Sequence, residues 1–415
     1  MPRPNTEYEI CLSGKIKISD LEKIEPLNKT RRKIVNYHSK YFDSEDLYLL
    51  NNSLGLRLRY ENSCWVQTLK YERRDQSRLE WNSRSTSKDN RKILKINGLT
   101  LPNNKTLNKN GCNLQKDLQD IAPTLEEKFS VHVKRTLWLL NYKGNKIEVS
   151  YDSGLIKTSE KQEKISEVEL ELIKGEPKAL WLLAKDFIKK LPNLCVESQS
   201  KAFRGFLLNG LNWKNFNPSG NSRTIQKSTN FKKILKETVL EKNKMLSFSI
   251  LMLVKKKEIH AKNILIQTLI ELKYIFQFLV LIKVYKSKQN LSYFKSLRCK
   301  CFTLEYKLQI KNNKKFDDVI SSKTTQLLIA DIGLFANNID TLLLETGINK
   351  TIEKFFLKIE ESIHKRKNLN YETQNYQYRK RAFKLIPYNR NFFLSIGISE
   401  ALIMENNNLD LLITN

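Results

Sequence analysis

The sequence predicts an α+β protein: an eight-stranded antiparallel β-barrel with flanking helices, followed by an all-α helical domain. Three observations lead to this fold class. In the first half of the chain, apolar and polar residues alternate with a period of two, which is typical of half-buried strands. Turn-forming residues separate these runs at short intervals. Beyond residue 230 the apolar residues recur at helical spacing instead.

Eight segments carry the strand pattern, at the close spacing that favours a closed barrel. They are Tyr8–Leu12, Lys33–Phe42, Gly55–Tyr60, Cys64–Tyr71, Arg78–Ser83, His132–Leu140, Lys146–Tyr151 and Ser166–Ile173. Helices around the barrel are expected at Ser19–Leu27, Leu114–Ile121 and Glu176–Lys190. Pro177 suits the first turn of the last of these. In the second half, the helical spacing covers Phe231–Tyr285, Asp317–Glu345 and Lys350–Lys367.

The segment 209–228 is rich in Asn, Gly, Ser and Pro, which predicts a linker. We therefore expect a barrel domain over residues 1–208 and a helical domain over residues 229–415. A chain of 415 residues with 40% hydrophobic residues is long enough to form two cores.

The composition narrows the cellular setting. A formal net charge of +29 indicates an anionic partner, and nucleic acids, membrane surfaces, nucleotides and phosphate chains all qualify. Six cysteines without paired spacing favour a reducing compartment. No signal-peptide pattern is present, and no apolar run approaches the roughly 18 residues of a membrane-spanning helix. We expect a cytoplasmic protein that does not enter the membrane.

The run S-E-V-E-L-E-L at 166–172 is the most informative stretch of the chain. Successive side chains of a strand point to opposite faces, so Glu167, Glu169 and Glu171 share one face. Like charges about 7 Å apart repel each other unless cations lie over them. Two interpretations remain open at this point: a solvated edge strand, or one wall of a cavity that holds cations.

Other strands carry ionisable residues on one face in the same way. These residues are Glu7, Glu9, Arg57, Arg59, Lys70, Glu80, Glu148 and Asp152. If all these faces point inward, the charged interior is costly unless it binds a ligand. A phosphate chain with divalent cations satisfies both signs of charge, because Arg and Lys bind phosphate oxygens while carboxylates hold the metal.

The order of these motifs resembles that of the CYTH proteins, also called triphosphate tunnel metalloenzymes. The resemblance is carried by Glu7-Tyr-Glu9, L-G-L-R-L-R at 54–59, T-L-K at 68–70, Arg135, I-E-V-S-Y-D-S-G at 147–154 and E-V-E-L-E at 167–171. In addition, S-Q-S-K-A-F-R-G at 198–205 is similar to the closing segment of bacterial inorganic triphosphatases that carry a helical CHAD domain. This resemblance implies an eight-stranded tunnel, Mg²⁺ or Mn²⁺, and hydrolysis of triphosphate to pyrophosphate and phosphate.

The resemblance also implies roles for individual residues. The implied metal ligands are Glu7, Glu9, Asp152, Glu167, Glu169 and Glu171. The implied phosphate ligands are Arg57, Arg59, Lys70, Arg135 and Lys201. The implied catalytic residues are Glu7, Glu9, Glu80 and Lys70.

The chain departs from the family pattern at three places. Cys11 stands where the family has a lysine, and Leu137 stands where a second basic residue is usual. Both changes remove a cation that would contact phosphate, which predicts reduced activity. The segment 259–270 resembles a CHAD motif whose basic positions are lost, so the helical domain is expected to be a degenerate CHAD-like domain.

The leading hypothesis from the sequence is a metal-dependent inorganic triphosphatase acting on triphosphate. Three alternatives stay open. The substrate could be another triphosphate, such as thiamine triphosphate or a nucleotide. The chain could bind polyphosphate without catalysis, as the losses at Cys11 and Leu137 suggest. Nucleic-acid binding by the basic C-terminal half rests on charge alone.

Overall fold

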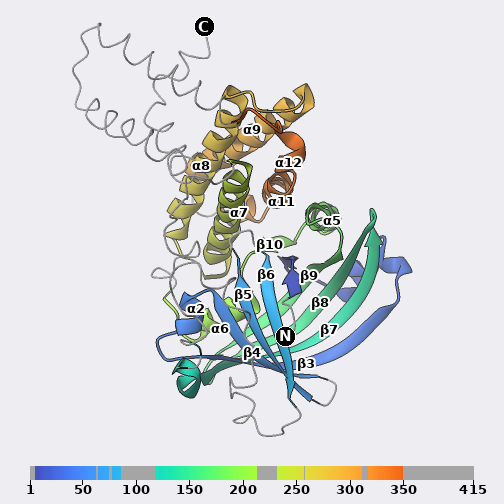
Figure 1. Cartoon of the computed structure of the whole chain (residues 1–415), viewed down its shortest axis with the longest axis vertical. Coiled ribbons are helices and arrows are strands. Elements are labelled where there is room, and N and C mark those ends of the chain that lie inside the picture. Colours follow the sequence, from blue (N-terminus) through green and yellow to red (C-terminus); the bar gives the residue numbers. More distant parts are fainter. Residues whose placement is uncertain are drawn as a thin grey trace, which may run out of the picture. The chain divides into compact units, whose positions relative to one another are not determined.

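The computed structural model describes residues 5–61, 64–73, 77–85, 118, 120–212, 231–256, 258–310 and 316–348 (Figure 1). The chain divides into two compact units, residues 1–222 and 223–415, and each unit is described by itself. The division falls within the segment 209–228 that the sequence marks as a linker.

The first unit is built on one antiparallel sheet of ten strands in the order β1-β6-β5-β4-β3-β7-β8-β9-β2-β10. The strands are β1 (Asn5–Glu7), β2 (Glu9–Ser13), β3 (Arg32–Asp43), β4 (Leu54–Glu61), β5 (Cys64–Glu72), β6 (Arg78–Ser85), β7 (Glu126–Tyr142), β8 (Asn145–Lys157), β9 (Gln162–Lys174) and β10 (Cys195–Glu197). Strands β2 to β9 confirm the eight predicted segments, and β1 and β10 are additional short edge strands.

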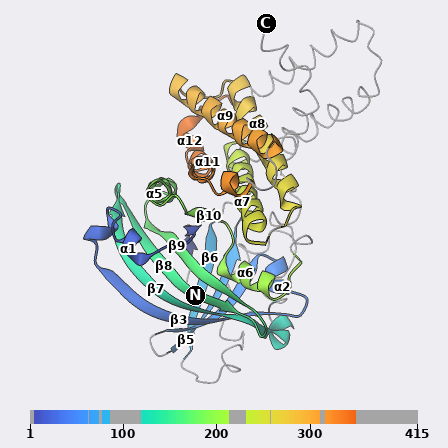
Figure 2. The same ribbon diagram turned by 180° about the vertical axis from the view of Figure 1, so that it is seen from behind.

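The closed barrel of eight strands was wrong in strand number and in closure. The sheet is open and strongly curled, with β1 and β10 at its edges (Figures 1 and 2). Only Tyr8 separates β1 from β2, yet β1 pairs with β6 and β2 pairs with β9. The chain itself therefore connects the two ends of the ladder at Tyr8, whose carbonyl accepts a 2.9 Å hydrogen bond from the Leu172 backbone N–H.

Two apolar clusters support opposite faces of this sheet. On β4, Leu54, Leu56 and Leu58 pack on the outer face with Leu49 of α2 (Tyr48–Asn51). The second cluster brings Phe129 of β7 against Phe206 of α6 (Lys201–Leu208), together with Val131, Val133, Ile156 and Ile165. Because side chains alternate along a strand, burying the leucines of β4 turns Arg57 and Arg59 to the other, concave face.

The flanking helices agree in part with the sequence-based expectation. Helix α5 (Lys178–Lys190) confirms the predicted helix, with Pro177 as its N-cap. The predicted helix Ser19–Leu27 is instead two short pieces, α1 (Ile18–Leu21) and the 3-10 turn Leu27–Lys29. Pro26 lies between them and cannot continue a helix. Most of the predicted Leu114–Ile121 helix lies outside the described residues, and Leu118, Asp120 and Ile121 within it are helical.

The second unit is helical in the part that the structure describes. It comprises α7 (Phe231–Lys256), α8 (Ala261–Leu281), α9 (Lys288–Ile310), α10 (Phe316–Ile320), α11 (Lys323–Ala336) and α12 (Ile339–Leu342). Phe335 packs edge-to-face on Phe276 and Phe294, with ring centroids 5.1 and 5.5 Å apart. Helix α9 was not among the predicted helical stretches, and the predicted stretch Lys350–Lys367 lies outside the described residues.

Helix α8 corrects one expectation from the sequence. It has the length and composition of a membrane-crossing helix, with an 18-residue window of mean hydropathy 1.7, and half of that window is buried inside the structure. Asn263, Gln267 and Lys273 break this helix into shorter apolar runs, although the average hydropathy of the window is high. Leu265, Leu269, Leu272, Phe276 and Leu279 of α8 are fully buried, as in the core helix of a helical domain.

Candidate functional site

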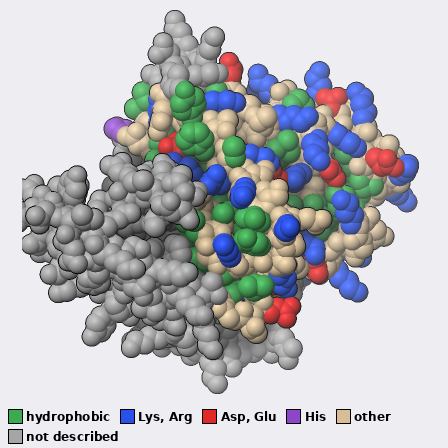
Figure 3. Space-filling model, turned by 90° about the horizontal axis from the view of Figure 1, so that it is seen from above, with side chains coloured by type: hydrophobic (Ala, Val, Ile, Leu, Met, Phe, Trp, Pro, Cys, Tyr) green, Lys and Arg blue, Asp and Glu red, His purple; other side chains and the backbone are tan. Residues whose placement is uncertain are grey.

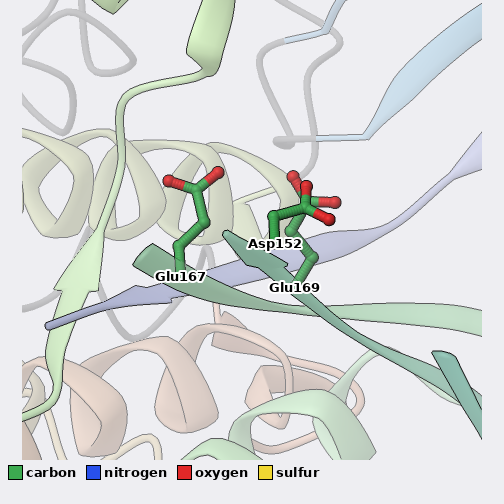
Figure 4. Close-up of side chains that lie close together, drawn as sticks. All are labelled: Asp152, Glu167 and Glu169. Carbon is green, nitrogen blue, oxygen red and sulfur yellow. The ribbon is translucent and has the colours of Figure 1, made fainter. Parts of the chain in front are cut away.

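Three carboxylates, two of them buried and the third half-buried, form the centre of the charged concave face. Asp152 of β8 and Glu167 of β9 are directly opposite each other in the ladder, and Glu169 lies two residues farther along β9. Their side chains rise on the same side of the two strands (Figure 4). The three groups offer oxygen atoms within 4.8 Å of one another, and Asp152 is 0% exposed. Three carboxylates this close require cations between them.

Lys201 supplies one of these cations from α6. Ser200 caps the helix by accepting a hydrogen bond from the Phe203 backbone N–H at 3.2 Å, which fixes Lys201 in the first turn. The Lys201 ammonium lies 2.8 Å from Asp152 and 2.5 Å from Glu169, and it also contacts Glu167. Burial acts to lower the pKa of Lys201, but the three carboxylates outweigh it and raise the pKa well above its usual value.

Two guanidinium groups, those of Arg135 and Arg204, neutralise the remaining negative charge of these three carboxylates. Arg135 donates two hydrogen bonds of 2.6 Å to Asp152 and also contacts Glu169. Arg204, which is 3% exposed, donates to Glu167 at 2.5 Å and to Glu163 at 2.9 Å. Sequence reasoning missed Arg204, although its spacing of three from Lys201 places both on one helix face.

A second group of charges lies between β1, β2, β5 and β6. The Lys70 ammonium is 2.8 Å from Glu7 and 3.7 Å from Glu80, and Glu80 is also 3.7 Å from Arg57. Arg78 donates a 3.0 Å hydrogen bond to Glu9. Sequence reasoning missed Arg78 as well. Its position two residues before Glu80 on β6 places it on the same face, which is the signal that could have revealed it.

A third group consists of three carboxylates, and its central member, Glu171, has no ion-pair partner among the described residues. Glu171 lies opposite Glu9 of β2 and Glu148 of β8, so the three carboxylates form a row across neighbouring strands. Burial, together with Glu7, Glu9 and Glu148, raises the pKa of Glu171 to about 8. Burial and the nearby Glu169 raise the pKa of Glu9 to about 7. Glu171 makes no hydrogen bond or ion pair with the described residues. A divalent cation fits this row, because it would replace the missing positive charge.

The predicted phosphate-binding arginines of β4 are held by aromatic residues of β3. The Arg59 guanidinium lies 4.5 Å from the centroid of the Tyr37 ring and 2.8 Å from Glu61. Arg57 lies near Tyr41, which is stacked on Phe129 at 4.8 Å, and donates a 3.4 Å hydrogen bond to Thr68. The Nε atoms of both arginines are buried and have no hydrogen-bond partner.

The two departures from the family pattern occupy defined places in the sheet. Cys11 lies opposite Glu169 on one side and Glu197 on the other. Burial and the nearby Glu167 raise the pKa of the Cys11 thiol well above its ordinary value, so it brings no charge to the site. Leu137 lies opposite Ser150 on β8.

The charged residues of the concave face therefore fall into three separate groups, whereas the sequence predicted a single site. The six predicted metal ligands do not form one group. Asp152, Glu167 and Glu169 bind Lys201 and arginines, Glu7 binds Lys70, and Glu9 binds Arg78. Glu171 lies opposite Glu9 and has no ion-pair partner among the described residues. Acidic and basic residues are interleaved rather than placed on opposite walls. The individual roles of these residues stay predictions.

A cavity of about 380 Å³ is lined by residues that include Tyr37, His38, Tyr60, His132 and Lys134. The two histidines are opposite each other on β3 and β7, and their rings are stacked at 4.1 Å.

Comparisons with known proteins bear on the first unit. Residues 4–206 match the CYTH domain. The inorganic triphosphatase of Haemophilus influenzae is 32% identical over 179 residues, which cover 40% of this chain and 44% of that relative. The match thus spans less than half the length of the curated relative.

Solved structures cover a similar share of the chain. A putative adenylyl cyclase from Hippeastrum, described as having a dominant triphosphatase activity, is 14% identical and covers 49% of this chain and 96% of its own, with a TM-score of 0.31. A putative adenylate cyclase from Bacillus halodurans is 18% identical and covers 44% of this chain and 89% of its own, with a TM-score of 0.29. The match to the CYTH domain does not depend on these structural comparisons. Residues 4–206 of this chain form a CYTH domain.

Proposed function

We propose that this chain is a metal-dependent inorganic triphosphatase that hydrolyses triphosphate to pyrophosphate and phosphate. One observation carries the proposal: the concave face of the CYTH domain combines Arg and Lys side chains with a row of carboxylates in which Glu171 has no ion-pair partner among the described residues. Phosphoryl transfer requires mainly positioning and charge stabilisation, and this set of residues supplies both without a Cys, Ser or His nucleophile.

Two groups of carboxylates could hold Mg²⁺ or Mn²⁺. Glu9 and Glu171, with Glu7 beside them, form one, and Asp152, Glu167 and Glu169, whose oxygen atoms lie within 4.8 Å of one another, form the other. Oxygen ligands are those that both ions prefer. Once bound, the ion would supply neutralisation of the negative charge that develops on the phosphate oxygens. In the free protein, Asp152 and Glu167 also bind Lys201.

On the substrate side, Arg57, Arg59, Lys70, Arg135 and Lys201 would bind phosphate oxygens. Arg135 and Lys201 contact carboxylates in the free protein, so binding exchanges one anionic partner for another. Glu80, held by Lys70 and Arg57, is placed to orient a water molecule. That water attacks the terminal phosphorus, the bond to the bridging oxygen breaks, and pyrophosphate leaves.

The wider assignments follow from this proposal. We infer a CYTH domain over 1–208, a linker over 209–228 and a degenerate CHAD-like domain over 229–415, in a cytoplasmic protein whose partner is triphosphate or polyphosphate. Nucleic-acid binding is less favoured. On the face shown in Figure 3, Lys and Arg side chains are scattered among acidic and apolar ones rather than gathered in one patch.

The test is phosphate release from tripolyphosphate in the presence of Mg²⁺ or Mn²⁺. Glu169→Gln should lower turnover by about 100-fold or more, because Glu169 contacts both Arg135 and Lys201. Glu160→Gln is the matched control, since Glu160 is exposed in the turn between β8 and β9. Thiamine triphosphate and ATP test the alternative substrates. Tight binding of tripolyphosphate without release at any metal concentration would refute hydrolysis and favour the non-catalytic binder.

A further inference from the structure

Tyr37 lies between two of the arginines that the proposed function assigns to phosphate. Its strand, β3, has β4 on one side and β7 on the other in the sheet. The Arg59 guanidinium from β4 is 4.5 Å from the centroid of the Tyr37 ring, and the Arg135 guanidinium from β7 is 5.7 Å from it. One aromatic ring therefore contacts cations from both neighbouring strands, at distances at which a ring face attracts a guanidinium.

The two arginines differ in how their N–H groups are used. Arg135 makes hydrogen bonds through Nε and one terminal nitrogen to Asp152, and it also contacts Glu169. Arg59 has one carboxylate partner, Glu61, and its buried Nε has no partner. Burial and the neighbouring Arg57 lower the pKa of Arg59, so this guanidinium lies where positive charge is least well compensated.

An aromatic ring stabilises a guanidinium in a way that a carboxylate does not. A carboxylate occupies N–H donors and adds a negative charge that repels an approaching phosphate. A ring face attracts the cation through its quadrupole and leaves the donors at the edge of the guanidinium unused. The ring of Tyr37 thus offsets charge while Arg59 keeps N–H groups for a ligand.

We propose that Tyr37 is a positioning residue for the anion site, which holds Arg59, and secondarily Arg135, through the face of its ring. This inference rests on the proposed function, because the anion that benefits is a phosphate chain. The Tyr37 hydroxyl makes no hydrogen bond to the described residues, so the ring carries the effect. The substitution Tyr37→Phe should then be silent, whereas Tyr37→Leu removes the contact.

Steady-state kinetics with tripolyphosphate and Mg²⁺ separate these outcomes. Tyr37→Leu should raise KM by about 3- to 30-fold with a smaller change in kcat, and Tyr37→Phe should stay within about twofold of the unmodified protein. Tyr60→Leu is the matched control: Tyr60 lies on the same sheet but, being next to Arg59, points to the opposite face, where it is 46% exposed. Equal losses in Tyr37→Phe and Tyr37→Leu, or an unchanged KM in both, would overturn the proposal.

A second measurement does not depend on turnover. In the ligand-free full chain, the Nε–H signal of Arg59 in an NMR spectrum of arginine side chains should shift in Tyr37→Leu and stay in place in Tyr37→Phe and Tyr60→Leu. If the chemical shift of the Arg59 Nε–H signal is unchanged in Tyr37→Leu, the role of the ring is refuted. Failure of the proposed function looks different: no variant, including the unmodified protein, releases phosphate, while the Arg59 signal still depends on the ring at position 37.

Discussion

Arg135 and Asp152 are joined twice, as register partners on β7 and β8 and through two side-chain hydrogen bonds of 2.6 Å. Asp152 has no exposed surface, so its charge depends entirely on its cationic neighbours. Arg135, which we propose binds phosphate, thus also stabilises the ligand-free protein. If Arg135 binds phosphate as proposed, its guanidinium would exchange the Asp152 carboxylate for a phosphate oxygen.

The first prediction concerns this pair. Arg135→Met should lower the free energy of unfolding by about 3–5 kcal/mol, because it leaves a buried carboxylate with only Lys201 as its cation. Urea denaturation measures the change. Lys40→Met is the control, since it breaks the more exposed Lys40–Glu127 pair and should cost no more than about 1 kcal/mol. Equal losses in the two variants would mean that Arg135 has no special structural role.

The second prediction is a pH dependence of stability. Glu9 and Glu171 have pKa values of about 7 and about 8 in the folded protein, above the ordinary carboxyl value of 4.5. Between pH 5 and pH 8 the folded chain therefore holds protons that the unfolded chain has released. Stability should fall as pH rises through this window, by at most about 1.4 kcal/mol per pH unit for each group, and level off above it.

Added Mg²⁺ or Mn²⁺ should flatten this pH profile, because the bound cation favours the deprotonated carboxylates. Thermal unfolding at several pH values, with and without the metal, tests both statements. Glu171→Gln should remove part of the slope in the metal-free protein. Stability that rises from pH 5 to pH 8 without metal would contradict the interpretation of this acidic row.

The third prediction concerns Cys11. Cys11→Lys would place an ammonium next to Glu169, at the position where the family carries a lysine. We expect KM for tripolyphosphate to fall by roughly tenfold, as for one added charge-assisted contact. Cys11→Met is the control of similar length without the charge. An unchanged KM in both variants would show that the missing cation does not limit binding.

Sequence alternation was enough to predict the eight main strands and the residues that share a face, because both depend only on local periodicity. It could not predict which charges would meet. Lys70 and Glu7 are 63 residues apart in the chain, and their contact follows from the strand order β1-β6-β5 rather than from any local pattern. The periodicity places Arg78 and Arg204 on a site face, but it does not identify Glu9 and Glu167 as their partners. Strand β1 has only three residues, too few for alternation to be visible.

The fourth prediction concerns Gly205 on α6. A Cβ at this position would overlap the ring of Phe129, which stacks on Tyr41. Gly205→Ala should therefore destabilise the protein by about 1–3 kcal/mol, although alanine favours helices. Gly55→Ala is the control, because a Cβ there meets nothing within 4 Å, and its stability should stay the same or rise by up to about 1 kcal/mol. Chemical denaturation that shows equal stability for the two variants would argue against tight packing of α6.

The pairing of β2 with β9 and β10 has a consequence for biosynthesis. Glu9 and Cys11 of β2 are synthesised about 160 to 190 residues before their strand neighbours Glu169, Glu171 and Glu197. Lys201 and Arg204 of α6, which compensate the buried acids, are made later still. The nascent chain therefore carries β2 without its two neighbouring strands until β9 and β10 have been made, and the charged centre is complete only when α6 emerges.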